Sequence, residues 1–181
     1  LTLVVSPLIS LVQDQVDGMV SKGPYPNVPT THITGTATET QKTAIRRSLE
    51  RMLDAHEGTM AANAPKLLYT TPEWLEKALL SGDASVPGSW RGIFERLRDA
   101  GLVARVVVDE AHCLKNAGAQ LYRTLMAYRC DHCLLITGTP LQNSLRELWA
   151  LLHFIEPGQF ADCDAFEETH STAVSYTHLT L

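Results

Sequence analysis

Five short apolar runs, rich in β-branched residues, alternate with stretches of helical periodicity along this 181-residue chain, and this alternation constrains the fold most strongly. The runs span residues 1–5, 31–34, 66–70, 105–109 and 133–137. Several are apolar at successive positions rather than at alternate ones, which is typical of strands buried on both faces. Strand–helix alternation of this kind predicts an α/β fold with a doubly wound parallel sheet.

Four stretches between or after these runs carry apolar residues at helical spacing, namely 8–20, 41–53, 71–80 and 141–155. The first, second and fourth each have one apolar stripe, as an amphipathic helix requires. The third begins with Pro72, a residue favoured in the first turn of a helix. Gln142 and Asn143 either cap the last of these helices or make a functional contact, and the sequence leaves both open.

Composition places the chain among ordinary globular proteins, with 45% hydrophobic and 19% charged residues. Its length is sufficient for one domain with a sizeable core. No apolar run reaches the roughly 20 residues of a membrane span, so we expect no membrane association. The net charge of −5 argues against a strongly basic nucleic-acid surface, although it does not exclude a local phosphate-binding cleft.

The four cysteines are too few and too scattered for a secreted disulfide scaffold, which favours a reducing compartment. Cys130 and Cys133 have the C-x-x-C spacing of zinc ligands. A structural zinc site needs a second pair of ligands at suitable spacing, and His112, Cys113 and Cys163 supply that poorly. We therefore expect no zinc.

Polar residues follow all five predicted strands. They are Ser6-Pro7, Thr34 to Thr36, Thr70 to Glu73, Asp109 to His112, and Thr137 to Pro140. In an open parallel sheet, ligands bind beyond the carboxyl ends of the strands. Five strands that all end in hydroxyls, glycine or carboxylates predict one shared site at that edge.

The pair Asp109-Glu110 carries the most specific chemistry at this edge. An aspartate at the tip of a buried strand is suited to holding hydrated Mg²⁺ on a nucleotide. A neighbouring glutamate can orient or deprotonate the water that attacks the γ-phosphate. The alternative is that Asp109 caps a helix and Glu110 occupies its first turn. The following His112 and the "TGTP" string at 137–140 favour the catalytic interpretation.

The strings "VVVDEAH" and "LLITGTP" resemble motifs II and III of superfamily 2 helicases and translocases. Residues 1–113, with "LVVSPLISLVQDQVDGM", "LLYTTPEWL" and "DEAHC", resemble the RecQ DNA helicases. Residues 108–160, with "DEAH", "LKN", "TGTPLQN" and "ELWALLHF" in that order, resemble the Swi/Snf family of DNA translocases. The two halves therefore favour different branches of one superfamily.

This resemblance implies a RecA-like lobe of the P-loop NTPase class that uses ATP and Mg²⁺ and moves on DNA. It implies that Asp109 binds Mg²⁺, that Glu110 is the catalytic base and that His112 couples the nucleotide to DNA. The remaining implied roles are a relay through Thr137, Gly138 and Thr139, and contacts to the DNA backbone by Ser6, Pro7, Thr71 and Pro72.

The chain contains no G-x-x-x-x-G-K-[ST] loop and no Gly-Lys pair. We therefore interpret residues 1–160 as a partial ATP-binding lobe, incomplete at the N-terminus, which by itself is not expected to hydrolyse ATP. The resemblance implies a second RecA-like lobe elsewhere in the same protein. Residues 161–181 are predicted to be a tail, in which 171–181 lack a helical period and resemble a translated adapter.

Two classes of function are consistent with these features. The first is a DNA-dependent ATPase, either a RecQ-like helicase or a Swi/Snf-like translocase, with DNA and chromatin proteins as partners. The second is a non-catalytic RecA-like module that binds other proteins. The expected compartment is the nucleus in a eukaryote and the cytoplasm in a bacterium.

Overall fold

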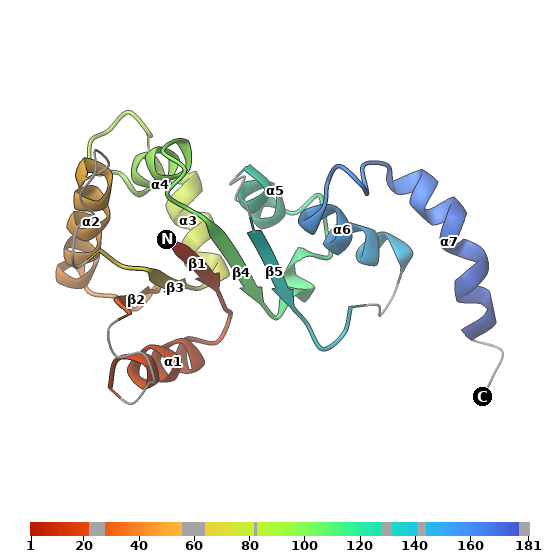
Figure 1. Cartoon of the computed structure of the whole chain (residues 1–181), viewed down its shortest axis with the longest axis horizontal. Coiled ribbons are helices and arrows are strands. Elements are labelled where there is room, and N and C mark those ends of the chain that lie inside the picture. Colours follow the sequence, from red (N-terminus) through yellow and green to blue (C-terminus); the bar gives the residue numbers. More distant parts are fainter. Residues whose placement is uncertain (22–27, 56–63, 82, 128–131, 141–143, 178–181) are drawn as a thin grey trace.

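A five-stranded parallel sheet forms the centre of the molecule (Figure 1). The computed structural model describes residues 1–21, 28–55, 64–81, 83–127, 132–140 and 144–177. The strands are β1 (Thr2–Val5), β2 (Thr30–Ile33), β3 (Leu67–Thr70), β4 (Arg105–Asp109) and β5 (His132–Ile136), in the order β2-β3-β1-β4-β5. Every adjacent pair is parallel. Each strand lies within one residue of its predicted run, so the parallel sheet is confirmed.

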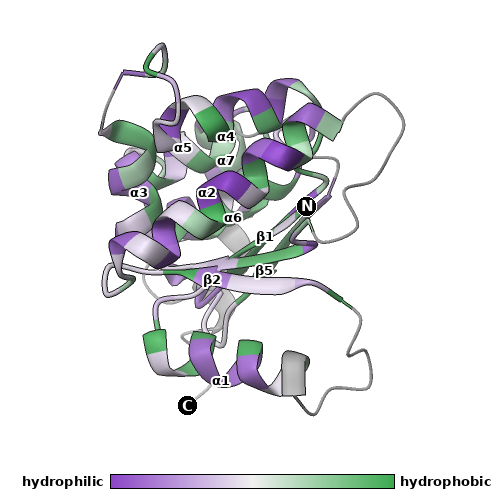
Figure 2. Ribbon diagram, turned by 90° about the vertical axis from the view of Figure 1, so that its left-hand side faces the viewer, coloured by the Kyte–Doolittle hydropathy of each residue, from purple (hydrophilic) through white to green (hydrophobic). Residues whose placement is uncertain are grey.

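Helices cover both faces of this sheet, which confirms the doubly wound architecture (Figure 2). Helix α1 (Ile9–Ser21) lies on one face, and α2 (Glu39–Asp54), α3 (Pro72–Leu80) and α4 (Trp90–Asp99) lie on the other. The remaining helices are α5 (Gln120–Ala127), α6 (Leu145–Ile155), α7 (Cys163–Thr177) and a short 3₁₀ helix, η2 (Ala111–Leu114).

Side-chain caps fix where several helices begin. Thr38 and Gln41 form a reciprocal capping box at the start of α2, which satisfies two backbone N–H groups that have no partner within the helix. Thr71, Ser89 and Ser144 accept a backbone N–H at the starts of α3, α4 and α6. Ser144 thus caps α6, whereas Gln142 and Asn143 lie outside the described residues.

The main core lies between the sheet and the layer formed by α2, α3 and α4. Leu3, Val5, Leu68, Val106 and Val108 point into it, and each is at most 1% exposed. Val4 lies outside this cluster, because successive strand residues face opposite sides. Strand β1 is therefore buried on both faces, as its continuous apolar sequence predicts, whereas β3 and β4 are buried on this face and only partly buried on the other.

The structure differs from the sequence interpretation in three helices. Helices α4 and α5 were not among the predicted ones, and α7 runs to Thr177, through part of the segment expected to lack a helix. The boundary at residue 160 stays a prediction. Within the described part of the chain, no helix is both long and apolar enough to cross a membrane.

Candidate functional site

The four buried polar residues found among the described residues all lie at the carboxyl edge of the sheet. Ser6, Thr34, Thr70 and Thr71 are at most 3% exposed, and they end or directly follow β1, β2 and β3. A hydroxyl group is retained in a protein interior only where it finds a hydrogen-bond partner. The partners of these hydroxyls therefore indicate how the edge is built.

Ser6 and Asp109 are joined by the most direct contact at this edge. The Ser6 hydroxyl donates a hydrogen bond to Oδ2 of Asp109 over 3.0 Å, although 103 positions separate the two residues. The other carboxylate oxygen, Oδ1, accepts the backbone N–H of Glu110 at 3.0 Å. Both oxygens of Asp109 are thus oriented by the protein.

Glu110 adopts a left-handed backbone conformation, with φ of 50° and ψ of 51°. It is the one non-glycine residue with positive φ in the described segments. A side chain with a Cβ atom disfavours this region by about 1–2 kcal/mol. The alternative in which Asp109 caps a helix is wrong, because Glu110 precedes η2 as its N-cap and makes no side-chain capping bond.

His112 lies beside Glu110. Its Nδ1 is 3.3 Å from Oε2 of Glu110, and both side chains are about half exposed. The pair lies on the open side of the edge, where solvent or a ligand can reach both groups. Cys113, the next residue, is half-buried, and burial raises the pKa of its thiol.

The predicted DNA-contact residues lie on neighbouring strand ends. The backbone N–H of Ser6 donates to the carbonyl of Thr70 at 2.9 Å, which places the segments 6–7 and 71–72 side by side. The Thr71 hydroxyl accepts the backbone N–H of Trp74 at 3.4 Å, and Pro72 is buried at the first position of α3. The hydroxyls of Ser6 and Thr71 therefore already have partners within the protein.

A groove of about 450 Å³ begins beside Thr71. It runs between the N-terminal part of α2 and the whole length of α3, and its lining includes Gly35, Trp74 and the two lysines Lys42 and Lys77. Glu39 and Glu73 also line the groove, so its wall carries both acidic and basic side chains.

Thr137, Gly138 and Thr139 follow β5, the neighbour of β4. The strand register pairs Asp109 with Ile136, so Thr137 directly follows the position next to Asp109. The backbone N–H of Thr139 donates to the Thr137 hydroxyl at 3.2 Å, which makes a tight polar turn. The structure therefore brings this segment beside Asp109 and Glu110.

The donor set fits a magnesium ion. Carboxylate oxygens are hard ligands of the kind that Mg²⁺ prefers, and Mg²⁺ commonly binds through one or two carboxylates together with substrate phosphates. The chain has no Gly-Lys pair to cradle those phosphates. Asp109 and Glu110 therefore suit a metal ion and the metal-binding side of a nucleotide site.

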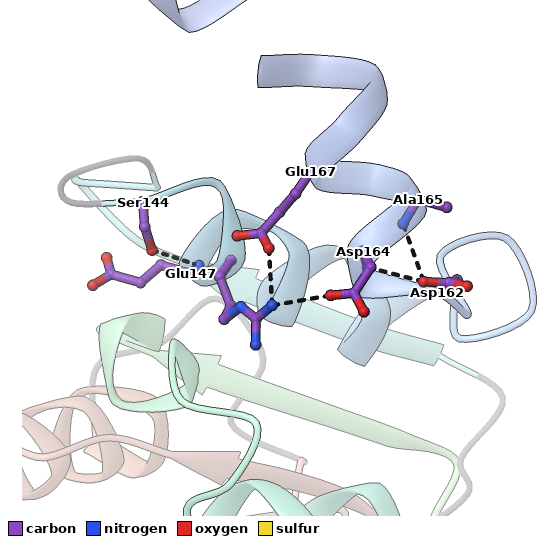
Figure 3. A network of polar contacts seen from close by, with 7 residues as sticks. Ser144, Glu147, Asp162, Asp164, Ala165 and Glu167 are labelled. Atoms are coloured by element: carbon purple, nitrogen blue, oxygen red, sulfur yellow. Dashed lines mark hydrogen bonds and ion pairs between the residues drawn. The ribbon is translucent and has the colours of Figure 1, made fainter.

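The absence of zinc at Cys130 and Cys133 stays a prediction, and Cys130 lies outside the described residues. Another group of possible ligands, Cys163, Asp164 and Glu167, lies at the start of α7. Both of its carboxylates bind Arg146, at 3.1 and 2.9 Å (Figure 3). This hydrogen bonding lowers the pKa of Glu167, so the cluster is explained as an ion-pair network between α6 and α7.

One contact near the site was not foreseen. Lys115 lies 3.5 Å from Glu147, and this pair joins the segment after η2 to the first turn of α6. Both residues belong to strings quoted above, "LKN" and "ELWALLHF". Their opposite charges are the one feature of the sequence that could have suggested an ion pair. Their proximity depends on the fold.

Comparison with protein families finds a match to the model described as "SNF2-related domain" over residues 31–178. Human "Chromodomain-helicase-DNA-binding protein 1" is 54% identical over 78 residues, which are 43% of this chain and 5% of that protein. "Protein CHROMATIN REMODELING 5" of Arabidopsis thaliana is 48% identical over 85 residues, 44% of this chain and 5% of that protein. The matches thus span about one twentieth of the length of these relatives.

Among solved structures, the chain is similar to the "Sulfolobus solfataricus SWI2/SNF2 ATPase core in complex with dsDNA". The TM-score is 0.58 with 18% identity, and the match covers 97% of this chain and 29% of the other. This likeness supports the RecA-like fold. The comparisons support the Swi/Snf-like resemblance and extend it into residues 31–113, while they give no support to the RecQ-like one.

Proposed function

Because the chain belongs to the family of SNF2-related domains, we propose that it is part of the first RecA-like lobe of an ATP-driven translocase that moves on double-stranded DNA. In this proposal Asp109 holds Mg²⁺, Glu110 is the general base, and a second lobe of the same protein completes the ATP site. When ATP is bound, the reaction would be the hydrolysis by water of its terminal phosphate bond.

The orientation of the Asp109–Glu110 pair is the observation that carries this proposal. Phosphoryl transfer depends mainly on positioning and on neutralisation of charge. Asp109 has both oxygens oriented by hydrogen bonds, and Glu110 is turned away from the line of β4 by its left-handed backbone. Such a costly conformation beside a fixed carboxylate is typical of functional sites.

The proposed DNA path runs along the carboxyl edge, over Pro7 and the start of α3. Backbone N–H groups and small polar residues suit phosphate contacts that do not read bases. Since the Ser6 and Thr71 hydroxyls already bond within the protein and Pro72 is buried, we assign DNA contact here to backbone groups, to Pro7, and to Lys77 in the adjacent groove. Thr137, Gly138 and Thr139 are proposed to relay this contact toward the second lobe, and His112 to couple it to the nucleotide.

The names of the relatives point to chromatin, so chromatin proteins are proposed partners and the nucleus is the proposed compartment if the source is a eukaryote. The compartment would be the cytoplasm in a bacterium. A RecQ-like helicase remains the second candidate, because the strings in residues 1–113 resemble that family. The two differ in activity, since the first moves along intact duplex and the second separates its strands.

The test requires the longer reading frame around this segment, obtained by sequencing the source locus. The expressed protein is expected to hydrolyse ATP in a manner stimulated by duplex DNA, and to displace a triplex-forming strand without unwinding the duplex. Asp109→Asn and Glu110→Gln are expected to lower turnover by a factor of at least 100 while duplex binding persists. ATP hydrolysis that persists in both variants would refute the assigned roles, and efficient strand separation would favour the RecQ-like candidate.

A further inference from the structure

Ser6 and Asp109 face one another because of the strand register. Val5 of β1 pairs with Val108 of β4 in the parallel register, so the next residues along the two strands are again neighbours. Laterally adjacent residues of paired strands point to the same face. The hydroxyl of Ser6 therefore meets the carboxylate of Asp109 at the edge of the sheet, at 3.0 Å.

This hydrogen bond is shielded from solvent on the serine side. Ser6 is 1% exposed, and its backbone N–H is held by the carbonyl of Thr70 at 2.9 Å. A buried donor with a fixed backbone loses little freedom when it orients an acceptor. The hydroxyl therefore restricts rotation of the Asp109 carboxylate more strongly than a surface serine would.

The carboxylate keeps capacity for a cation after both protein bonds are made. Oδ2 accepts from Ser6 and Oδ1 accepts from the N–H of Glu110. An ionised carboxylate offers about four lone-pair sites, so each oxygen retains one for a metal ion or its water. The two bonds thus set the direction of the remaining lone pairs.

We propose that Ser6 is a positioning residue of the metal site: its buried hydroxyl aligns the Asp109 carboxylate for a divalent cation. The proposal rests on the function proposed above, in which Asp109 is the metal ligand. It also gives the segment between β1 and α1 two roles, since Ser6 orients the metal ligand and Pro7, next to it, lies on the proposed DNA path. Partners that orient metal ligands typically change metal affinity by about 10–100-fold when removed.

The test is a titration of the 181-residue chain with Mn²⁺, followed by the electron paramagnetic resonance signal of the free ion, so that no catalytic turnover is needed. Ser6→Ala is expected to weaken Mn²⁺ binding at this site about tenfold. Ser6→Thr keeps the hydroxyl and is expected to restore most of the affinity. Ser89→Ala is the matched control, because it removes a serine hydroxyl that caps α4 away from the site and is expected to leave Mn²⁺ binding unchanged.

Asp109→Asn separates the two proposals. If it binds Mn²⁺ as well as the unaltered chain does, Asp109 is not the ligand, and both the metal assignment and the role of Ser6 fall. If Asp109→Asn loses the site but Ser6→Ala binds normally, only the role of Ser6 is refuted. Equal weakening by Ser6→Ala and Ser6→Thr would also refute it, because the effect would then come from packing rather than from the hydroxyl. Circular dichroism and urea unfolding of each variant verify that it is folded.

Discussion

Lys115 and Glu147 form an ion pair, with 3.5 Å between Nζ and Oε2, that joins the end of η2 to the first turn of α6. Both side chains are largely shielded, at 9% and 23% exposure. The pair therefore links the two polypeptide segments that follow β4 and β5, the strands that carry the carboxylate pair and the "TGTP" turn.

Removal of one partner of this pair is expected to destabilise the fold. Lys115→Met removes this charge partner from the Glu147 carboxylate, which should lower the free energy of unfolding by about 2 kcal/mol, somewhat less than for a fully buried pair. The control is Lys42→Met, which breaks the shorter Lys42–Glu39 pair of 2.7 Å. Glu39 is 83% exposed, so this loss should be clearly smaller than that of Lys115→Met. Urea denaturation compares the two, and an equal loss would contradict the role assigned to burial.

The left-handed backbone of Glu110 leads to a second prediction. Asparagine tolerates this conformation better than glutamate, and a β-branched residue tolerates it worst. Glu110→Asn is therefore expected to be more stable than the unaltered chain, and Glu110→Val less stable. The free energies of unfolding of the two variants should differ by about 2 kcal/mol.

The same substitutions at Glu76, in the interior of α3, provide the control for Glu110. Asparagine and valine have similar helix propensities, so the two Glu76 variants should differ by less than about 0.5 kcal/mol in unfolding free energy. A spread at Glu110 no larger than the spread at Glu76 would show that the backbone there carries no strain.

The sheet could be predicted from the sequence because its signal is local. Four of the strands lie in short, mainly apolar runs ended by polar residues, whereas β2, with the sequence Thr-Thr-His-Ile, is marked by its β-branched residues. Helix α4 also has a local signal that the sequence interpretation overlooked: Trp90, Ile93, Phe94 and Leu97 are spaced i, i+3, i+4 and i+7. Helix α7 lacks such a pattern, and Phe166 is the buried apolar residue that anchors it.

The residues of the candidate site could be chosen from the sequence, but their geometry could not. Asp109 and Glu110 stand out because two carboxylates directly follow a buried strand. The bond from Ser6 to Asp109 depends on the register between β1 and β4, which no local pattern specifies. The left-handed backbone of Glu110 could not be predicted from the sequence either, since glutamate is not a residue type that indicates this conformation.

Tyr122 should make stability fall in alkaline solution. Its hydroxyl donates to the carbonyl of Ala150 at 3.1 Å, and burial raises its pKa to about 12. Between pH 10 and 12 the unfolded chain releases this proton while the folded chain retains it, so the folded state loses stability as pH rises. The loss from this group should reach about 1 kcal/mol by pH 11.

Tyr122→Phe is the test of that pH dependence. It should cost about 1 kcal/mol at pH 8, because the Ala150 carbonyl loses its donor. The stability difference between the two proteins, measured by urea denaturation from pH 8 to 11, should then shrink as the pH rises. A difference that stays constant over this range would show that Tyr122 titrates normally.

The packing of α7 on α6 combines an exposed ion-pair network with an apolar contact, and we expect the apolar contact to dominate. Arg146 is 61% exposed, and its partner Asp164 is 90% exposed, so Arg146→Met should weaken the local protection of α7 only slightly. Phe166 is 8% exposed and packs edge-on against Phe160, with ring centroids 6.0 Å apart. Phe166→Ala should cost at least about 2 kcal/mol of local protection.

Hydrogen exchange of the backbone amides of residues 167–171 measures the opening of α7 directly. In Phe166→Ala these amides should exchange at least about 30-fold faster than in the unaltered chain, since 2 kcal/mol corresponds to that factor. In Arg146→Met the increase should stay below about fivefold. Salt at high concentration should slightly accelerate exchange in the unaltered chain but not in Arg146→Met, because screening acts on the ion pairs alone. If Arg146→Met opens α7 as much as Phe166→Ala does, the ion-pair network rather than the buried ring holds the helix in place.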